Sequence, residues 1–270
     1  MQIKTLKATF KRNFIIQIRA YTKDFFIGHL FSGILTALSA YFMYHLMFKG
    51  NVKASFADYA GTGDYMSYVI VGSVTYLLAV RTCLNVSRSL ITELREGTLD
   101  SLMIAPFSRI QYFLGNMLQQ TITAVGEMFI TLLVCVPFGV SFSKINFVST
   151  FIAFILSLLS YFSVSMILAT IMLYTRDTYI SQNTLFSLMF LLCGVTFPVQ
   201  YLPQYLQWIS KVIPITYSFD IIRNSSLRGL GIMEQMQSFT IILAASLVYC
   251  FVGFKLLKKV EIIALEKTFG

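Results

Sequence analysis

The sequence predicts an all-α membrane protein with six transmembrane helices, and two observations lead to that prediction. Of the 270 residues, 56% are hydrophobic and 12% are charged, whereas a soluble domain carries about 25% charged residues. Six apolar stretches are also long enough to cross a bilayer core of about 30 Å, which takes about 20 residues of helix. They are residues 25–48, 65–86, 110–140, 147–174, 179–199 and 239–257.

The basic residues favour an orientation with both ends of the chain in the cytoplasm. Most Lys and Arg residues outside the apolar stretches fall on the side that holds the N-terminus, as the positive-inside rule expects of cytoplasmic segments. Six spans then return the C-terminus to that side. Topology and anionic lipid headgroups account for the net charge of +9, so a nucleic-acid partner is not expected.

The first 24 residues predict a separate interface helix, ahead of a transmembrane domain over residues 25–270. Apolar residues recur there at helical spacing, and Lys and Arg fill the positions between them. That pattern is typical of a helix lying in the headgroup plane. The alternative is a solvated charged arm. The apolar positions are Ile3, Leu6, Phe10, Phe14 and Ile18.

The connection over residues 87–109, predicted to be cytoplasmic, contains the sequence ELREGTLDSLMIAP. Gly97 and Thr98 are expected to break the chain and cap a short helix, with Asp100 in its favourable first turn. Pro106 would end that helix. A helix this short with one apolar face either docks a partner or lies against the bilayer. The apolar stripe is Leu99, Leu102 and Met103.

The connection over residues 197–229, predicted to be extracellular, is too apolar for a solvated loop and too broken for a span. Pro198, Pro203 and Pro214 interrupt helical geometry, and proline favours the first turn of a new helix. A re-entrant helical hairpin that dips into the outer leaflet fits both properties. The aromatic residues expected to anchor it at the interface are Tyr201, Tyr205, Trp208 and Tyr217.

These two connections resemble the permeases of type-2 ABC exporters. ELREGTLDSLMIAP, residues 93–106, is similar to that family's coupling segment. FPVQYLPQYLQWISKVIPITYSFDIIR, residues 197–223, resembles its proline-rich extracellular segment before the last span. The order of the segments and the six-span frame match over nearly the whole chain, and the resemblance extends to drug, antibiotic and polysaccharide exporters.

The resemblance implies a transport subunit in a bacterial plasma membrane that pairs with a second copy of itself or a related permease, and with two cytoplasmic ATPases. Its substrate would be apolar or amphipathic: a drug, an antibiotic peptide, a lipid or a lipid-linked glycan. The implied ATPase-coupling residues are Glu93, Arg95, Glu96, Gly97, Thr98, Leu99, Asp100, Leu102, Met103 and Pro106. The implied outer-segment residues are Pro198, Pro203, Trp208, Pro214, Tyr217 and Arg223.

Enzymatic chemistry in this chain is not expected. The sequence contains no GxxxxGK[ST] phosphate loop, so ATP and Mg²⁺ would bind to a separate ATPase, and no cofactor is expected here. Only two histidines occur, far apart on the first predicted span, and the four cysteines lie singly. Neither pattern is typical of a metal or catalytic site.

One acidic residue, Glu127, lies well inside an apolar stretch. Ionisable groups inside a membrane are candidates for a functional role, so Glu127 is a candidate for the substrate path. The alternative is a pairing that serves helix packing. Arg81 on the preceding stretch either extends to the headgroups or pairs with Glu127.

Two other classes of membrane protein compete with an exporter subunit. An ion-coupled secondary transporter or channel usually shows internal repeats and buried ion-binding acids, and the sequence offers one intramembrane acid and no visible repeat. A membrane-embedded enzyme would need a catalytic constellation. Both alternatives are weaker than an exporter subunit.

Overall fold

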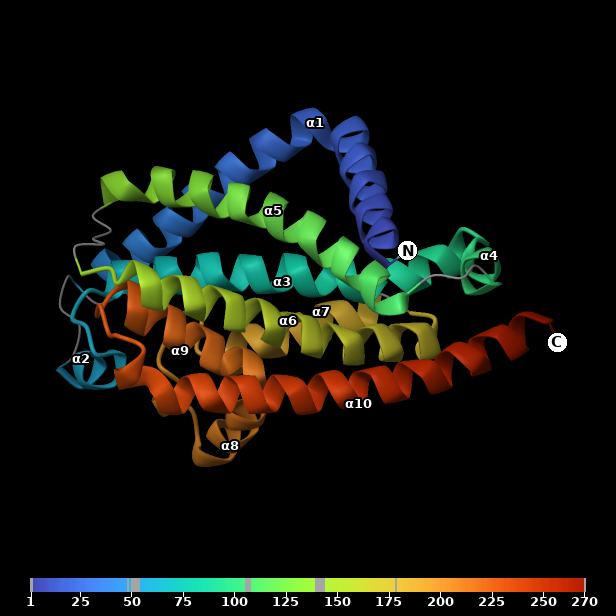
Figure 1. The fold of residues 1–270 in the computed structure, drawn as a ribbon. Helices are drawn as coiled ribbons and strands as arrows, with labels where there is room; N and C mark the ends of the chain where they lie inside the picture. The colour runs from blue at the N-terminus through green and yellow to red at the C-terminus, as the bar shows by residue number, and fades with distance from the viewer. Residues whose placement is uncertain are drawn as a thin grey trace.

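The computed structural model describes residues 2–47, 49, 54–104, 108–138, 144–177 and 179–269 (Figure 1). Within these ranges the regular elements are helical, in agreement with the predicted class. The α-helices are α1 Gln2–Phe42, α2 Ala54–Ala60, α3 Tyr65–Arg95, α4 Leu99–Ile104, α5 Arg109–Cys135, α6 Phe147–Thr175, α7 Tyr179–Leu192, α8 Gln204–Val212, α9 Pro214–Ser226 and α10 Met236–Phe269. Short π and 3-10 turns follow α1 and α5 and precede α8 and α10.

Four segments are long and apolar enough to cross a membrane: Tyr65–Arg95, Arg109–Cys135, Phe147–Thr175 and Met233–Ile263. They correspond to the second, third, fourth and sixth predicted spans. The fifth, predicted over residues 179–199, contains a helix of 14 residues, α7, followed by a turn. The first, residues 25–48, falls mostly in α1, where many side chains lie outside the described part. The count of six spans stays a prediction.

Helix α1 joins the two segments that the sequence separates at residue 24. It is helical throughout Gln2–Phe42, and Figure 1 shows two arms of α1 meeting at an angle. The N-terminal arm begins at the end of the molecule where α4 and the C-terminus of α10 also lie, while α2 lies at the opposite end. The segments predicted to share the cytoplasmic side therefore lie together.

The centre of the bundle is formed by α3 and α6, which pack against each other. On its other sides α3 contacts α5 and α9, while α6 contacts α10 and α9. Helix α6 approaches its neighbours closely because its buried face carries small polar residues, as is usual in membrane helices. The hydroxyls of several bond to carbonyls three or four residues earlier, which satisfies them without a partner helix. These self-bonded residues are Ser157, Ser163, Ser165 and Thr170.

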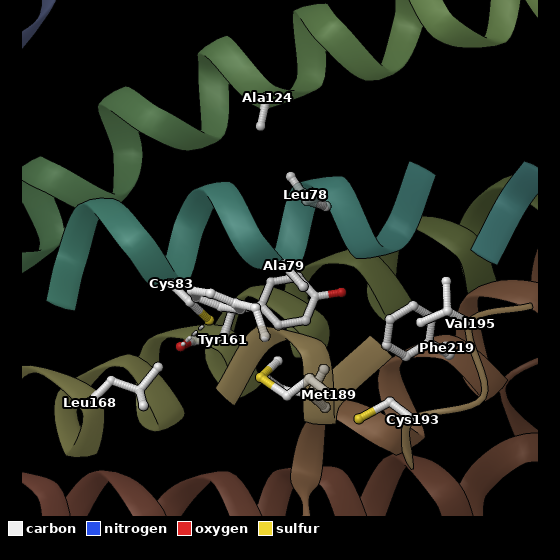
Figure 2. Packing of buried hydrophobic residues seen from close by; sticks show 12 residues of the cluster. Leu78, Ala79, Cys83, Ala124, Tyr161, Leu168, Met189, Cys193, Val195 and Phe219 are labelled. Carbon is white, nitrogen blue, oxygen red and sulfur yellow. Dashed lines mark hydrogen bonds between the residues drawn. The ribbon is translucent and has the colours of Figure 1, made fainter. Parts of the chain in front are cut away.

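A core of buried apolar residues joins α3, α6, α7 and α9 (Figure 2). Tyr161 of α6 is fully buried and lies next to Ala79 and Cys83 of α3. Farther along the core, Phe219 of α9 lies near Val195, in the turn after α7. Three of the four cysteines are buried and the fourth is half-buried, and all four are free thiols. This agrees with a packing role.

Helix α9 is attached to α3 and α7 by Arg223, whose residue exposure is 5%. Its Nη1 donates to the Gly194 carbonyl at 2.7 Å and its Nη2 donates to the Val195 carbonyl. On α3, Nε donates to the Tyr68 carbonyl at 3.3 Å, and the guanidinium carbon lies 3.7 Å from the Tyr68 ring centroid. Three carbonyls and an aromatic face thus compensate the buried charge.

Gly72 of α3 makes room for this arginine. A Cβ atom at position 72 would overlap both Arg223 Nη2 and the Val195 carbonyl oxygen. Among the described residues, Gly126 of α5 has no heavy atom within 4 Å of the corresponding Cβ position. Of these two glycines, Gly72 is the one whose described neighbours leave no room for a side chain.

Gly72→Ala is therefore expected to displace Arg223 and to destabilise the protein by about 1–3 kcal/mol, the usual cost of overpacking. Gly126→Ala is the matched control and should leave stability unchanged or raise it by up to about 1 kcal/mol, because alanine favours a helix interior more than glycine does. Thermal unfolding midpoints in lipid nanodiscs measure both effects. Equal midpoints for the two variants would contradict the role assigned to Arg223.

Candidate functional site

The α3–α4 turn, residues 95–98, ends α3 through local hydrogen bonds. The Gly97 amide donates to the Leu94 carbonyl at 3.3 Å and the Thr98 amide donates to the Glu93 carbonyl at 2.9 Å. This is the Schellman arrangement, which needs a left-handed residue after the cap. Gly97 has a φ of 69° and supplies it. The predicted break at Gly97 is confirmed, but α3 continues to Arg95, so residues 87–95 are helix instead of a connection.

The carboxylate of Glu93 lies at the centre of this end of the molecule. Glu93 is 4% exposed, and three side chains from three different segments reach it. Its Oε1 accepts from Arg12 Nη1 of α1 at 2.5 Å and from the Tyr112 hydroxyl of α5 at 3.0 Å. Its Oε2 accepts from the Thr98 hydroxyl at 2.5 Å. The carboxylate therefore joins α1, α3, α5 and the α3–α4 turn.

Leu99, the first residue of α4, faces the interior. It is 2% exposed and packs with Val86 and Leu90 of α3 and Phe113 of α5. Leu102 is partly buried against the same cluster. These two residues of the predicted apolar stripe thus contact their own chain, while Ile104 is 85% exposed.

The remaining predicted coupling residues divide into three groups. Arg95, Glu96, Gly97 and Thr98 are exposed. The backbone of Asp100 and Met103 belongs to α4, but their side chains lie outside the described part. Pro106 lies outside the described residues altogether. Among the described residues, the exposed side chains of the α3–α4 turn itself are therefore polar, while Ile104 at the end of α4 is apolar.

A second ion pair joins the end of α10 to the start of α5. Arg109 Nε lies 2.9 Å from Glu261 Oε2, and the Glu261 side chain is 2% exposed. Because Arg109 follows the α4 segment in the chain, this pair and the Glu93 contacts hold both flanks of α4.

A polar cleft of about 540 Å³ lies between α1, α3 and α5, on the part of the bundle that leads to the α3–α4 turn. Its volume falls within the range of small-molecule sites, about 300–1,000 Å³. From α1 it is lined by Arg12, Asn13, Ile16 and Gln17. From α3 it is lined by Arg81, Leu84, Asn85, Arg88, Ser89, Thr92, Glu93 and Glu96. From α5 it is lined by Tyr112, Asn116, Gln119, Gln120 and Glu127.

Glu127 is in this cleft, and it is paired. Its side chain is 5% exposed, and its Oε2 lies 3.4 Å from Arg81 Nε, whose side chain is 45% exposed. The pairing that the sequence left open between α3 and α5 is therefore confirmed. Since an unpaired carboxylate inside a membrane is costly, Arg81 is what allows Glu127 to line the cleft as an ion.

Most lining residues other than Glu127 escaped the sequence analysis, although a signal for them exists. Arg81, Asn85, Arg88 and Thr92 recur every three or four residues on α3, and Asn116, Gln120 and Glu127 lie on one face of α5. A stripe of polar residues along one face of an otherwise apolar helix indicates that this face lies against polar residues of a neighbouring helix. On α1 the corresponding residues are Asn13 and Gln17, which the sequence analysis did not single out.

The outer segment, residues 197–229, contains the expected breaks at proline. Pro203 precedes α8, and Pro214 is the first residue of α9; Pro198 is buried in the turn before α8. The Tyr217 hydroxyl donates to the Lys211 carbonyl at 3.1 Å and joins the two helices. One face of α8 is exposed and apolar, with Trp208 at 68% and Tyr205 at 67%. Figure 1 shows α8 at the edge of the bundle, and insertion into the outer leaflet stays a prediction.

The comparison with known families decides what kind of protein has this fold. The profile of the ABC-2 type transporter family matches residues 4–227. The chain belongs to the ABC-2 type transporter family. This confirms the resemblance found in the two connections, and it identifies the chain as a multi-pass membrane protein of a transporter.

Two curated relatives are also similar to this ABC-2 chain. Both are named "Probable multidrug ABC transporter permease YbhR", one from Escherichia coli strain K12 and one from Escherichia coli O157:H7. Each is 24% identical over 170 residues, which is 61% of this chain and 45% of the relative. The alignment thus spans about half the length of these relatives.

Replacing the Glu93 carboxylate should loosen α4. Glu93→Gln keeps the size of the side chain but loses hydrogen bonds to a charged group, each of which contributes about 1.5–3 kcal/mol. We expect amides of residues 99–104 to lose roughly tenfold or more of their protection from hydrogen exchange.

Glu96→Gln is the matched control for this experiment. Its side chain is 54% exposed and lies 3.8 Å from Arg12, and exposed pairs contribute about 0–1 kcal/mol. Hydrogen exchange measured by mass spectrometry on the purified chain compares the two variants. If both change α4 equally, Glu93 has no special role in holding it.

Proposed function

We propose that this chain is the membrane subunit of an ATP-driven exporter powered by a separate cytoplasmic ABC ATPase. Two copies of the chain, or one copy and a related permease, would pair with two ATPase subunits in a bacterial plasma membrane. Family membership supports the transport role, and the permease named in both relatives agrees with it.

One observation supports the ATPase partner more than any other: the polar α3–α4 turn at the end of the molecule that holds both termini. Arg95 and Glu96 are exposed there, while Glu93 and Leu99 fix the turn from within. Exposed charges on a rigid support suit a protein interface that needs a defined register. In this proposal the turn receives the movement of the ATPase.

The same contacts give a route from the ATPase to the cleft. A displacement of the turn would act on Glu93, and through it on Arg12 of α1 and Tyr112 of α5. Arg12, Glu93 and Tyr112 all line the cleft. Movement at the turn would therefore change the shape of the cytoplasmic end of the cleft directly, because the same residues contact the turn and line the cleft.

The substrate proposed for this path is amphipathic or apolar. The relatives' name includes the words multidrug ABC transporter permease, which makes drug-like compounds the first candidates, followed by antibiotic peptides, lipids and lipid-linked glycans. Glu127, paired with Arg81 in the cleft, is the residue proposed to line the path.

Reconstitution in liposomes tests the proposal. The chain is purified together with its co-purifying ABC ATPase, and export of candidate substrates is measured with ATP and with a non-hydrolysable analogue. We expect export only with ATP. Transport that persists without ATP would instead favour an ion-coupled transporter.

Glu127→Gln tests the path in the same liposomes. Loss of the ion pair with Arg81 should lower the export rate by about tenfold, which corresponds to about 1.4 kcal/mol, while membrane insertion and ATPase binding remain. Glu234→Gln, which changes an exposed acid outside the cleft, is the control. Full export by Glu127→Gln would remove this residue from the path.

A further inference from the structure

The charges that line the cleft compensate one another. The arginines Arg12, Arg81 and Arg88 face the glutamates Glu93, Glu96 and Glu127, so the formal charges of the lining side chains that the structure describes cancel. Each glutamate lies within 4 Å of an arginine: Glu127 at 3.4 Å from Arg81, and Glu93 and Glu96 at 2.5 Å and 3.8 Å from Arg12. A cationic ligand would have to compete with these arginines, and an anionic ligand with the glutamates.

Most of the other polar side chains described on the cleft lining are amides. They come from all three helices, and several bond to one another across the cleft. Asn85 of α3 donates to Gln120 of α5 at 3.0 Å, and Asn13 of α1 donates to Asn116 of α5 at 2.5 Å. The amides of the cleft are Asn13, Gln17, Asn85, Asn116, Gln119 and Gln120.

These amides retain unused hydrogen-bonding capacity. An amide side chain offers two donors and an acceptor oxygen, and the bonds across the cleft use only part of this. Within the described residues, no hydrogen bond is made by Asn85 Oδ1, Gln17 Nε2 or Gln120 Nε2. Both unused donors and an unused acceptor therefore face the same space.

We propose that the cleft binds an uncharged, hydroxyl-rich headgroup of an amphipathic substrate, and this inference rests on the exporter function proposed above. A hydroxyl both donates and accepts hydrogen bonds, so it can pair with the unused amide donors and with the unused amide acceptor. It carries no charge and therefore needs no counter-ion. The apolar part of the substrate would remain in the bilayer beside the helices. The apolar residues Ile16 and Leu84 on the cleft lining would contact the portion of that apolar chain nearest the headgroup.

Other headgroups fit the lining less well. Because the carboxylates are already paired, a quaternary ammonium gains little from them. A peptide that binds by strand addition needs an exposed strand edge, and the described residues around the cleft are helical. A hydroxyl-rich group can instead take single hydrogen bonds from three helices at once.

Photolabelling of the purified chain in lipid nanodiscs, without any ATPase, tests this assignment. Four probes share one diazirine-bearing dodecyl chain and differ in the headgroup: glucose, trimethylammonium, phosphate or an acetylated alanine dipeptide. We expect the glucose probe to label cleft-lining parts of α3 and α5 saturably, with an affinity about tenfold or more above the others. Stronger saturable labelling of these parts by any other probe would overturn the proposal.

Variants of the amides make the test specific. Gln120→Leu removes an unused donor together with the oxygen that accepts from Asn85, and should weaken labelling by the glucose probe by about tenfold or more. Gln237→Leu is the matched control, because Gln237 is exposed on α10 outside the cleft and should leave labelling unchanged. Asn85→Ser introduces a hydroxyl that can still donate and accept, and it should weaken labelling less than Asn85→Leu. Unchanged labelling of Gln120→Leu would contradict a role for the amides.

The outcome separates this inference from the exporter proposal. If the glucose probe fails to label while ATP-dependent export of a charged substrate is observed, the headgroup is wrong and the exporter stands. If the glucose probe labels the cleft but no ATPase co-purifies and export needs no ATP, the binding site stands and the energy source is wrong.

Discussion

The buried carboxylate of Glu93 is the interaction on which the arrangement of the cytoplasmic end depends. A carboxylate removed from water is costly unless it is paired and hydrogen-bonded, and Glu93 meets that need with Arg12, Thr98 and Tyr112. Since these partners come from three separate segments, satisfying one charge positions the N-terminal arm of α1, the α3–α4 turn and the start of α5. The cleft between α1, α3 and α5 keeps its shape for the same reason.

A second buried charge fixes the opposite side of the bundle. Arg223 uses three carbonyls and the Tyr68 ring to hold α9 against α3 and the turn after α7. The two charges thus organise the two irregular connections of the chain. Between them lie the apolar helices, where small residues whose hydroxyls bond to their own helix allow α6 to approach its neighbours closely.

Much of the fold could be predicted from the sequence, because apolar length and proline positions are local properties. Four predicted spans, the break at Gly97 and the start of α9 at Pro214 follow from such signals. The inward position of Leu99 could not be predicted, since a six-residue helix shows the same stripe whether it packs on its own chain or on a partner. The cleft was also missed, except for Glu127, because its lining depends on how three helices meet. Glu93 was predicted as a coupling residue from resemblance alone, and its buried pairing with Arg12, 81 positions away, leaves no local trace.

A double-mutant cycle between Arg12 and Glu93 tests the central claim most directly, with the hydrogen-exchange protection of residues 99–104 as the readout. Arg12→Gln should lower this protection in the wild-type background, because Arg12 acts on the α3–α4 turn through the Glu93 carboxylate. In the Glu93→Gln background the same substitution should lower it much less, since the shared interaction is already lost. Equal losses in both backgrounds would show that the two residues act independently, and would contradict the account.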